Sequence, residues 1–292
     1  MDGSELTMLI GAHVSTGGGL VRAIERADER TCDAIQIFNQ SPRMWRPTRY
    51  SEDDFAAFRK ALEPSRVEVV AIHMIYLINP AARDKEMRKK SLDSLTHALR
   101  VGDGIGALGV VVHPGALKDD TRTNARKRAI NLIKEALARS ESCPILYENT
   151  AGSPQLLGRD FDETAELIEK TGGPKRLGLC IDTCHLYATG YDIASPEGTK
   201  KMVDEIDDKV GLKQLKLMHM NDATDPLGSN RDRHAPIGKG EIGRKGFRAF
   251  LGEPRLQGVP AVLEGPGIDG HDVARKDVQL IRRLWREAIQ KR

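Results

Sequence analysis

The chain has 292 residues, of which 39% are hydrophobic and 30% are charged, and its formal net charge is +3. This length fits two ordinary domains or one large α/β barrel, and a charge so close to neutral does not by itself mark a nucleic-acid-binding protein. The four cysteines are too few for a disulfide scaffold and indicate a reducing compartment. Residues 1–14 lack the basic and apolar regions of a signal peptide, and no apolar run is long enough to span a membrane. We therefore expect a cytoplasmic protein without a membrane partner.

Eight short apolar runs follow one another along the chain, and each closes on polar, glycine or proline residues. They cover residues 7–14, 33–40, 67–74, 109–115, 144–150, 177–183, 215–222 and 259–266. Segments with helical spacing of apolar residues lie between several of them, at residues 18–30, 52–63, 125–140 and 161–170. Nearly continuous apolar runs are typical of strands that are buried on both faces, as in a parallel sheet.

This alternation of strands and helices, without a linker or a low-complexity break, predicts a single (β/α)8 TIM barrel that covers residues 1–292. A doubly wound open sheet is the alternative, because alternation alone does not show that the sheet closes. The stretch "GAHVSTGGG", which begins within the first run, lacks the spacing of a dinucleotide-binding fingerprint. In a barrel the active site is expected at the C-terminal rim of the strands.

Residues that can bind metals gather at the predicted strand ends. In chain order they are His13, His73, His113, Glu148, Asp182, His185, His219, Asp222 and Glu264, and a loop after the seventh run adds Asp232 and His234. Imidazoles and carboxylates that converge on one rim are unfavourable unless protons or cations hold them. Several divalent metals would satisfy them at once. Zinc fits the mixture of nitrogen and oxygen ligands, and manganese fits a carboxylate-rich position.

The stretch "CIDTCH" raises the question whether its two cysteines form a zinc site or a disulfide. Three residues separate Cys180 from Cys184, rather than the two of a zinc knuckle or a redox motif. The two thiols and Asp182 would share one side only if the strand continued to Cys184. Because enough imidazoles and carboxylates are available, we interpret the thiols as packing around the site, with Asp182 and His185 as ligands.

The stretch "RDRH" repeats the pattern of an acid beside a histidine. Asp232 and His234 alternate, so both can face one ion while Arg231 and Arg233 face away. We therefore expect a further ligand pair in this loop.

Sequence motifs extend over nearly the whole chain. In order they are "IGAHVSTGGGL", "HMIYLIN", "VVHPG", "ENTAG", "CIDTCHLYATGYD", "MHMND", "GSNRDRHAPIGKGEIG" and "LEGPG". With these motifs the chain resembles the endonuclease IV family, the zinc-dependent apurinic/apyrimidinic endonucleases of DNA base-excision repair. "CIDTCH" and "DRH" are the most specific of them. The resemblance implies a (β/α)8 barrel with three clustered metal ions and double-stranded DNA with abasic sites as the partner, and we expect a monomer.

The resemblance also implies which residues hold each ion. His73, His113 and Glu148 would hold the first metal, and Glu148 would bridge to a second. The other ligands of the second metal would be Asp182, His219 and Glu264, and those of the third His185, Asp232 and His234. His13 would lie behind the ligands or on the phosphate side.

The resemblance further implies the reaction. Phosphodiester hydrolysis needs a nucleophile, neutralisation of the phosphate and help for the leaving oxygen, and clustered zinc ions supply all three. Cleavage would occur on the 5′ side of the abasic site, with Glu148 as the catalytic carboxylate, and would leave a 3′-hydroxyl and a 5′-deoxyribose phosphate. Arg43, Tyr76 and Leu77 would enter the base stack and hold the abasic nucleotide flipped out. The basic loop with Arg231 and Arg233 would contact phosphates.

Two other classes of function fit parts of the pattern. A sugar isomerase or epimerase on the same barrel would use a single-metal site formed by Glu148, Asp182, His219 and Glu264, but it would leave the other ligand candidates without a metal. Counting the bound metal ions would separate the two enzymes. A catalytically silent protein that binds damaged DNA would form no product, and the intact set of ligands argues against it.

Overall fold

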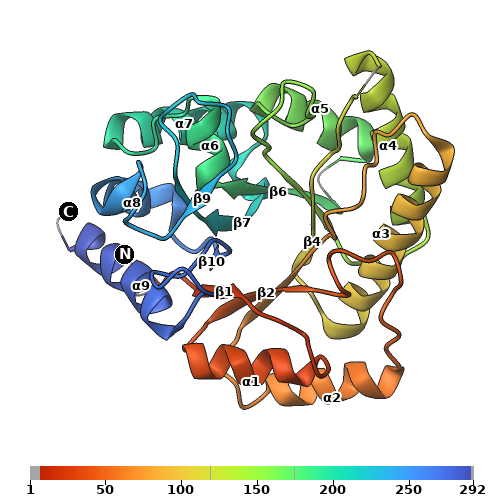
Figure 1. The fold of residues 1–292 in the computed structure, drawn as a ribbon, viewed down its shortest axis with the longest axis horizontal. Coiled ribbons are helices and arrows are strands. Elements are labelled where there is room, and N and C mark those ends of the chain that lie inside the picture. Colours follow the sequence, from red (N-terminus) through yellow and green to blue (C-terminus); the bar gives the residue numbers. More distant parts are fainter. Residues whose placement is uncertain (1–6, 119, 174, 291–292) are drawn as a thin grey trace.

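In the computed structural model, which describes residues 7–118, 120–173 and 175–290, eight parallel strands close into a barrel. They follow one another around it in the order β1-β10-β7-β6-β5-β4-β3-β2 (Figure 1). Their bounds are β1 Ile10–His13, β2 Ala34–Phe38, β3 Val69–His73, β4 Gly109–Val112, β5 Ile145–Glu148, β6 Leu177–Asp182, β7 Leu215–Met220 and β10 Ala261–Leu263. Each lies within one of the predicted runs. The predicted barrel is confirmed, and the open sheet is excluded because β1 pairs with both β2 and β10.

Helices surround the barrel (Figure 1). They are α1 Val21–Arg30, α2 Glu52–Leu62, α3 Lys85–Ile105, α4 Arg122–Ala138, α5 Phe161–Thr171, α6 Thr183–Thr189, α7 Pro196–Lys209, α8 Gly243–Leu251 and α9 Arg275–Ile289, with short 3-10 helices at Leu212–Gln214 and Pro254–Leu256. Polar caps begin several of them: Ser51 forms a capping box with Asp54 at the start of α2, and Asp84 accepts a hydrogen bond from the backbone of α3. Among the described residues, no helix has the length and apolar character needed to cross a membrane.

The barrel interior consists of an apolar layer below a polar one. The apolar layer is formed by Ala34, Ala71, Val111, Leu146, Cys180, Leu217 and Val262. Side chains alternate along a strand, so the residue two positions further on points the same way and lies nearer the C-terminal rim. These next residues are Gln36, His73, His113, Glu148, Asp182, His219 and Glu264. The apolar layer therefore forms the floor beneath the candidate metal ligands.

The rim also carries an element that the sequence does not predict. Two short strands, β8 (Asp222–Ala223) and β9 (His234–Ala235), pair antiparallel as a separate two-stranded sheet. The expectation that His234 lies in a loop was therefore wrong, because its backbone pairs with Ala223. At the end of β6 the helix α6 starts at Thr183, so the strand does not continue to Cys184 and the two cysteines do not share one strand face.

Candidate metal centre

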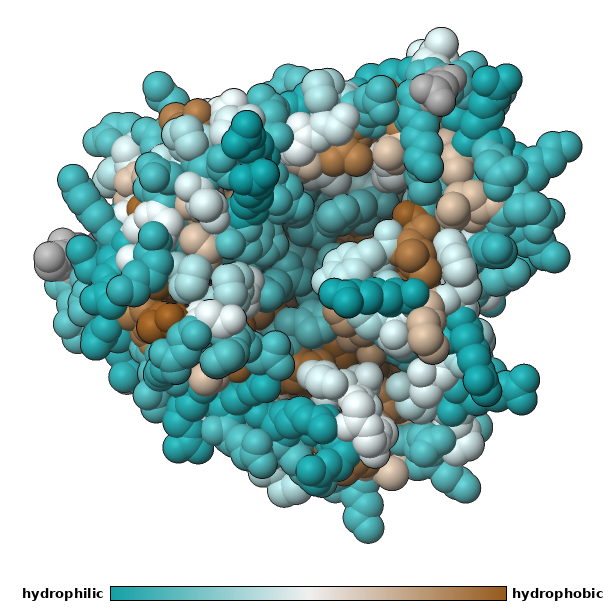
Figure 2. All heavy atoms as spheres, in the orientation of Figure 1, coloured by the Kyte–Doolittle hydropathy of each residue, from teal (hydrophilic) through white to brown (hydrophobic). Residues whose placement is uncertain are grey.

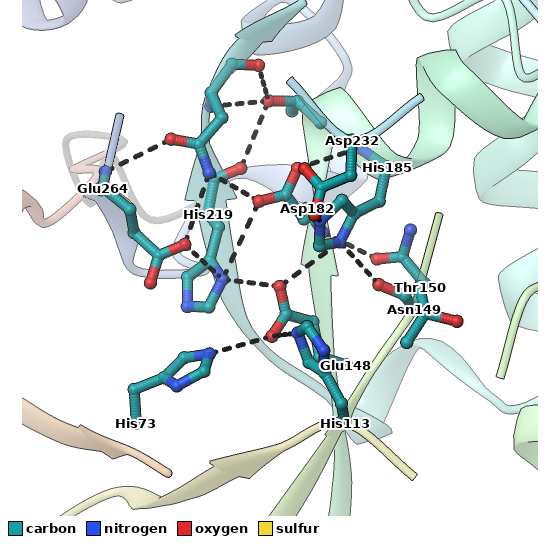
Figure 3. A network of polar contacts seen from close by, with 12 residues as sticks. His73, His113, Glu148, Asn149, Thr150, Asp182, His185, His219, Asp232 and Glu264 are labelled. Atoms are coloured by element: carbon teal, nitrogen blue, oxygen red, sulfur yellow. Dashed lines mark hydrogen bonds and ion pairs between the residues drawn. The ribbon is translucent and has the colours of Figure 1, made fainter. Parts of the chain in front are cut away.

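Glu148 lies at the centre of the polar layer, and only 1% of its surface is exposed. Its Oε2 atom lies 3.2 Å from His73 Nε2 and 2.9 Å from His113 Nε2. Its Oε1 atom lies 3.0 Å from His219 Nδ1 and 3.4 Å from His185 Nδ1 (Figure 3). One carboxylate thus faces four imidazoles from different elements of the rim.

The ligand candidates form four groups, and within each group the ligand atoms lie within 4.8 Å of one another. Three ligand groups contain only imidazoles and carboxylates: His73, His113 and Glu148; Glu148, Asp182, His219 and Glu264; and His185, Asp232 and His234. The fourth group includes a thiol and consists of Asp182, Cys184 and His234. The structure thus brings the residues together in the combinations that the family resemblance implies. Since zinc binds nitrogen and carboxylate oxygen at about 2.0–2.2 Å, atoms at this spacing can surround one ion.

Carboxylates and imidazoles balance one another in this cluster. Burial alone would raise the pKa of Glu148, but His113 and His219 hold it well below its usual value. Burial alone would lower the pKa of His185, but the carboxylates of Asp182, Asp232 and Glu148 raise it to about 10. The directions of these two pKa shifts favour protonated imidazoles as the positive charges that balance the carboxylates wherever a metal ion does not. An imidazole must lose the proton on the nitrogen that binds the metal. Metal binding to such a cluster therefore releases protons.

His185 is oriented by the start of α6. Asp182 caps this helix, and its Oδ1 atom accepts a hydrogen bond from the backbone nitrogen of His185 at 2.9 Å. The Nδ1 atom of His185 donates to Asn149 O at 2.8 Å, which leaves Nε2 facing Asp232 Oδ2 at 3.2 Å. Asn149 also accepts a hydrogen bond from the Asp182 backbone at 2.7 Å through its side chain. The pattern of strand ends did not single out Asn149, although it directly follows Glu148 in "ENTAG".

Two of the three side chains in the third group are open to solvent. The side chain of Asp232 is 40% exposed and that of His234 is 25% exposed, whereas that of His185 is 3% exposed. Asp232 Oδ1 lies 3.1 Å from His234 Nε2. Of the flanking arginines, Arg231 pairs with Asp225 at 3.3 Å, and Arg233 is exposed. The two ligand candidates thus face the same point while the arginines lie at the surface.

Asp222 holds the segment that follows His234. This carboxylate is fully buried and accepts hydrogen bonds from five backbone N–H groups. The donors beyond β9 are Gly238, Gly240, Ile242 and Gly243, at 2.8 to 3.3 Å. Asp222 belongs to none of the ligand groups. Its role among the described residues is to fasten the chain after β9 to the end of β7.

We expect Asp222→Asn to destabilise the protein by about 1–3 kcal/mol, because the new NH2 group would face the Gly238 and Gly240 donors that now point at Oδ2. Urea unfolding of the variant measures this loss. Asp225→Asn is the matched control in the same region, since it removes only an ion pair to the exposed Arg231 and is expected to cost at most about 1 kcal/mol. Equal stability of the two variants would contradict the role of Asp222.

Gln36 and His13 adjoin the ligand groups without belonging to them. Gln36 is fully buried in the middle of β2 and contacts His13, His219 and Glu264. Burial lowers the pKa of His13 to about 4, so this imidazole is neutral. The pattern of strand ends did not reveal Gln36. A glutamine inside the otherwise apolar run "AIQIF" is the signal that could have revealed it.

The cysteines are free and buried. Cys180 belongs to the apolar layer, and burial raises the pKa of its thiol to about 12. Cys184 lies on α6, where its thiol donates a weak hydrogen bond to Arg233 O at 3.6 Å. Its sulfur also lies within 4.8 Å of ligand atoms of Asp182 and His234. The two thiols form no disulfide and pack at the floor and the side of the cluster.

The cluster opens into a cavity of about 1320 Å³ that is lined by residues of all three ligand groups. Figure 2 shows it as a hollow at the centre of this face, with hydrophilic residues around much of it. Tyr76 lines the cavity, is 68% exposed, and its ring lies edge-on to Phe38 at 5.3 Å. Arg43 is exposed, whereas Leu77 is partly buried against the hydrophobic core. The predicted DNA-contacting residues therefore differ in how freely they can reach a ligand.

The sequence and the fold both match those of known proteins. A family model described as a xylose isomerase-like TIM barrel matches residues 24–284. A probable endonuclease 4 from Cenarchaeum symbiosum is 38% identical, over 89% of this chain and 93% of its own length. The chain belongs to the endonuclease IV family. A second endonuclease IV relative, a probable endonuclease 4 from Halothermothrix orenii, is 36% identical over 96% of this chain and 100% of its own length. The crystal structure of endonuclease IV from Thermus thermophilus matches with a TM-score of 0.80 at 35% identity, and covers 96% of this chain and 98% of that chain.

Proposed function

We propose that this member of the endonuclease IV family is a DNA-repair enzyme that hydrolyses the phosphodiester bond 5′ to an abasic site, with three divalent metal ions at the barrel rim. Relatives named endonuclease 4 support the class of reaction. The observation that carries the metal proposal is Glu148, a buried carboxylate that belongs to two ligand groups at once. A carboxylate shared in this way suits a site in which neighbouring ions act on one phosphate.

The donor set fits zinc. Each group combines imidazole nitrogen with carboxylate oxygen, and zinc accepts both. The group with three carboxylates and one imidazole also suits manganese. The first ion would be held by His73, His113 and Glu148, the second by Glu148, Asp182, His219 and Glu264, and the third by His185, Asp232 and His234.

Bound divalent ions in such a cluster supply a nucleophile near neutral pH and neutralise charge on the attacking and leaving oxygens. The residues of the chain hold this arrangement in place. His73 donates from Nδ1 to Met74 O at 2.7 Å, which leaves its Nε2 atom facing Glu148. Asn149 orients His185 in the same manner. Ligands oriented before the substrate binds need no reorganisation during the reaction.

The loops beside the cavity would bind the DNA. Tyr76, which is exposed and whose ring centroid lies 6.5 Å from that of His73, would enter the base stack next to the metal ligands. Arg43 and Leu77 would assist in holding the abasic nucleotide flipped out, which costs least where no base remains. Arg231 and Arg233, which are exposed and flank Asp232 in the chain, would contact phosphates.

A single-metal sugar isomerase or epimerase is the alternative, because the group of Glu148, Asp182, His219 and Glu264 alone would suffice for it. That function leaves the two other ligand groups without a metal, although their ligand atoms also lie within 4.8 Å of one another. A metal content near one ion per chain favours the isomerase, and about three favours the nuclease.

We expect the protein to cut a duplex that contains a reduced abasic analogue, on the 5′ side of the lesion. Reduction blocks β-elimination, so a lyase would leave this substrate intact, whereas a hydrolase would not. The products should be a 3′-hydroxyl, which a polymerase extends, and a 5′-phosphate that carries the reduced sugar, whereas a natural abasic site would give a 5′-deoxyribose phosphate. A chelator should stop the reaction, and the same duplex with an intact base is the control. An uncut lesion, or a cut on its 3′ side, would refute the proposal.

A further inference from the structure

Gln36 joins three residues around the candidate metal centre through one amide. Its Oε1 atom accepts a hydrogen bond from His219 Nε2 at 2.8 Å. Its Nε2 atom donates to Glu264 Oε1 and lies 3.2 Å from His13 Nδ1. Gln36 and His219 are both fully buried, so no water competes for these contacts.

The orientation of this amide is set by Glu264. If the amide were rotated by 180°, its oxygen would face the Glu264 carboxylate, and two acceptors would oppose each other in a buried place. The NH2 group therefore points to Glu264, and the oxygen must point to His219. Because an amide oxygen is only an acceptor, His219 carries its proton on Nε2.

This proton position decides how His219 can act. With Nε2 as a donor to Gln36, Nδ1 is the atom left for a metal, and Nδ1 is the atom that lies 3.0 Å from both Glu148 and Glu264. The second hydrogen of the Gln36 NH2 group donates to His13 Nδ1, so His13 carries its own proton on Nε2. His13 lines the cavity and thus offers an N–H donor there.

We infer that Gln36 is a positioning residue, which fixes His219 and Glu264 for metal binding at the group they form with Glu148 and Asp182. The inference rests on the proposed metal-dependent function. Partners that orient ligating imidazoles in this way change metal affinity about 10- to 100-fold when they are removed. Gln36 contacts an imidazole and a carboxylate of the same ligand group. Its loss should therefore lower the affinity of that group for its ion and leave the other ions in place.

Gln36→Met tests this, because methionine keeps the volume of the side chain but neither donates nor accepts strongly. Zinc retention is measured by elemental analysis after dialysis against graded concentrations of a chelator. The variant is expected to lose about one ion per chain, at about 10- to 100-fold lower chelator concentration than the wild type. In ¹⁵N-histidine spectra the Nε2–H signal of His219 should shift and exchange faster with solvent, because Gln36 Oε1 no longer accepts its hydrogen bond.

Two further variants keep the test decisive. Gln257→Met is the matched control, since this partly buried glutamine bonds to Leu251 and Trp285 away from the metal groups, and it should retain all zinc. Should Gln36→Met not fold, Gln36→Leu also removes both the donor and the acceptor without adding a charge, and the same loss of zinc is expected. Wild-type zinc retention in the Gln36 variants would overturn the inference. Absence of zinc from the wild type would instead overturn the proposed function.

Discussion

Glu148→Gln is expected to abolish incision of abasic DNA while the protein stays folded. Glu148 is 1% exposed and faces His73, His113, His185 and His219, so it lies where neighbouring ions would meet. The amide keeps the shape of the side chain but loses the charge that holds cations close together. Its NH2 group would also point at ligands that need an acceptor or a metal opposite them. Cleavage of the reduced abasic duplex, together with circular dichroism, measures both parts of the expectation.

A second buried glutamate provides the control for this variant. Glu163 on α5 is 6% exposed and pairs with Arg122 at 2.6 Å, away from the ligand groups. Glu163→Gln should therefore lower stability but retain zinc, with a cleavage rate within about tenfold of the wild type. If Glu148→Gln also cut within about tenfold of the wild type, Glu148 would not be central to the mechanism.

The fold could be predicted because each strand is buried on both faces and so appears as its own apolar run. All eight runs contain a barrel strand, from β1 to β10. The two-stranded sheet of β8 and β9 could not be predicted in the same way. The strands β8 and β9 have two residues each, too few for any periodicity, and Asp222 in β8 accepts hydrogen bonds from Gly238 and Gly240, which lie far along the chain.

The candidate ligands could be found for a related reason. The C-terminal ends of parallel strands meet at one rim, so a His, Asp or Glu at each end implies a cluster. Gln36 and Asn221 were missed because their importance comes from contacts across the barrel. Gln36 meets Glu264 from 228 positions away, and Asn221 donates to Asp182 and Glu264. A polar residue inside an apolar run, such as Gln36 in "AIQIF", signals an unusual position, but its partners become evident only once the barrel has closed.

The third ligand group differs from the others in where its residues lie. His234 is the first residue of β9 and Asp232 lies two positions before it, so neither comes from the end of a barrel strand. They are also more exposed than His185, Glu148 or His219. A barrel could keep the ligands of its strand ends without them, so this group can be tested by itself.

We expect His234→Ala to lower the bound zinc by about one ion per chain and to slow cleavage more than it weakens binding to abasic DNA. An ion that stabilises developing charge on the phosphate acts mainly in the transition state. Elemental analysis and single-turnover cleavage at saturating enzyme, on the same preparation, measure the two effects. Combining this change with Gln36→Met should remove about two ions, because the two residues serve different groups.

Arg233→Ala, one position away, distinguishes a ligand from a phosphate contact. Arg233 is exposed and belongs to no ligand group, so its loss should leave the zinc content complete and weaken DNA binding in a way that low salt relieves. If His234 only stabilised its chain segment or formed a hydrogen bond to a phosphate, His234→Ala would behave like Arg233→Ala. Full zinc content with a normal single-turnover rate in His234→Ala would therefore exclude His234 from the third metal site, while leaving the groups around Glu148 unaffected.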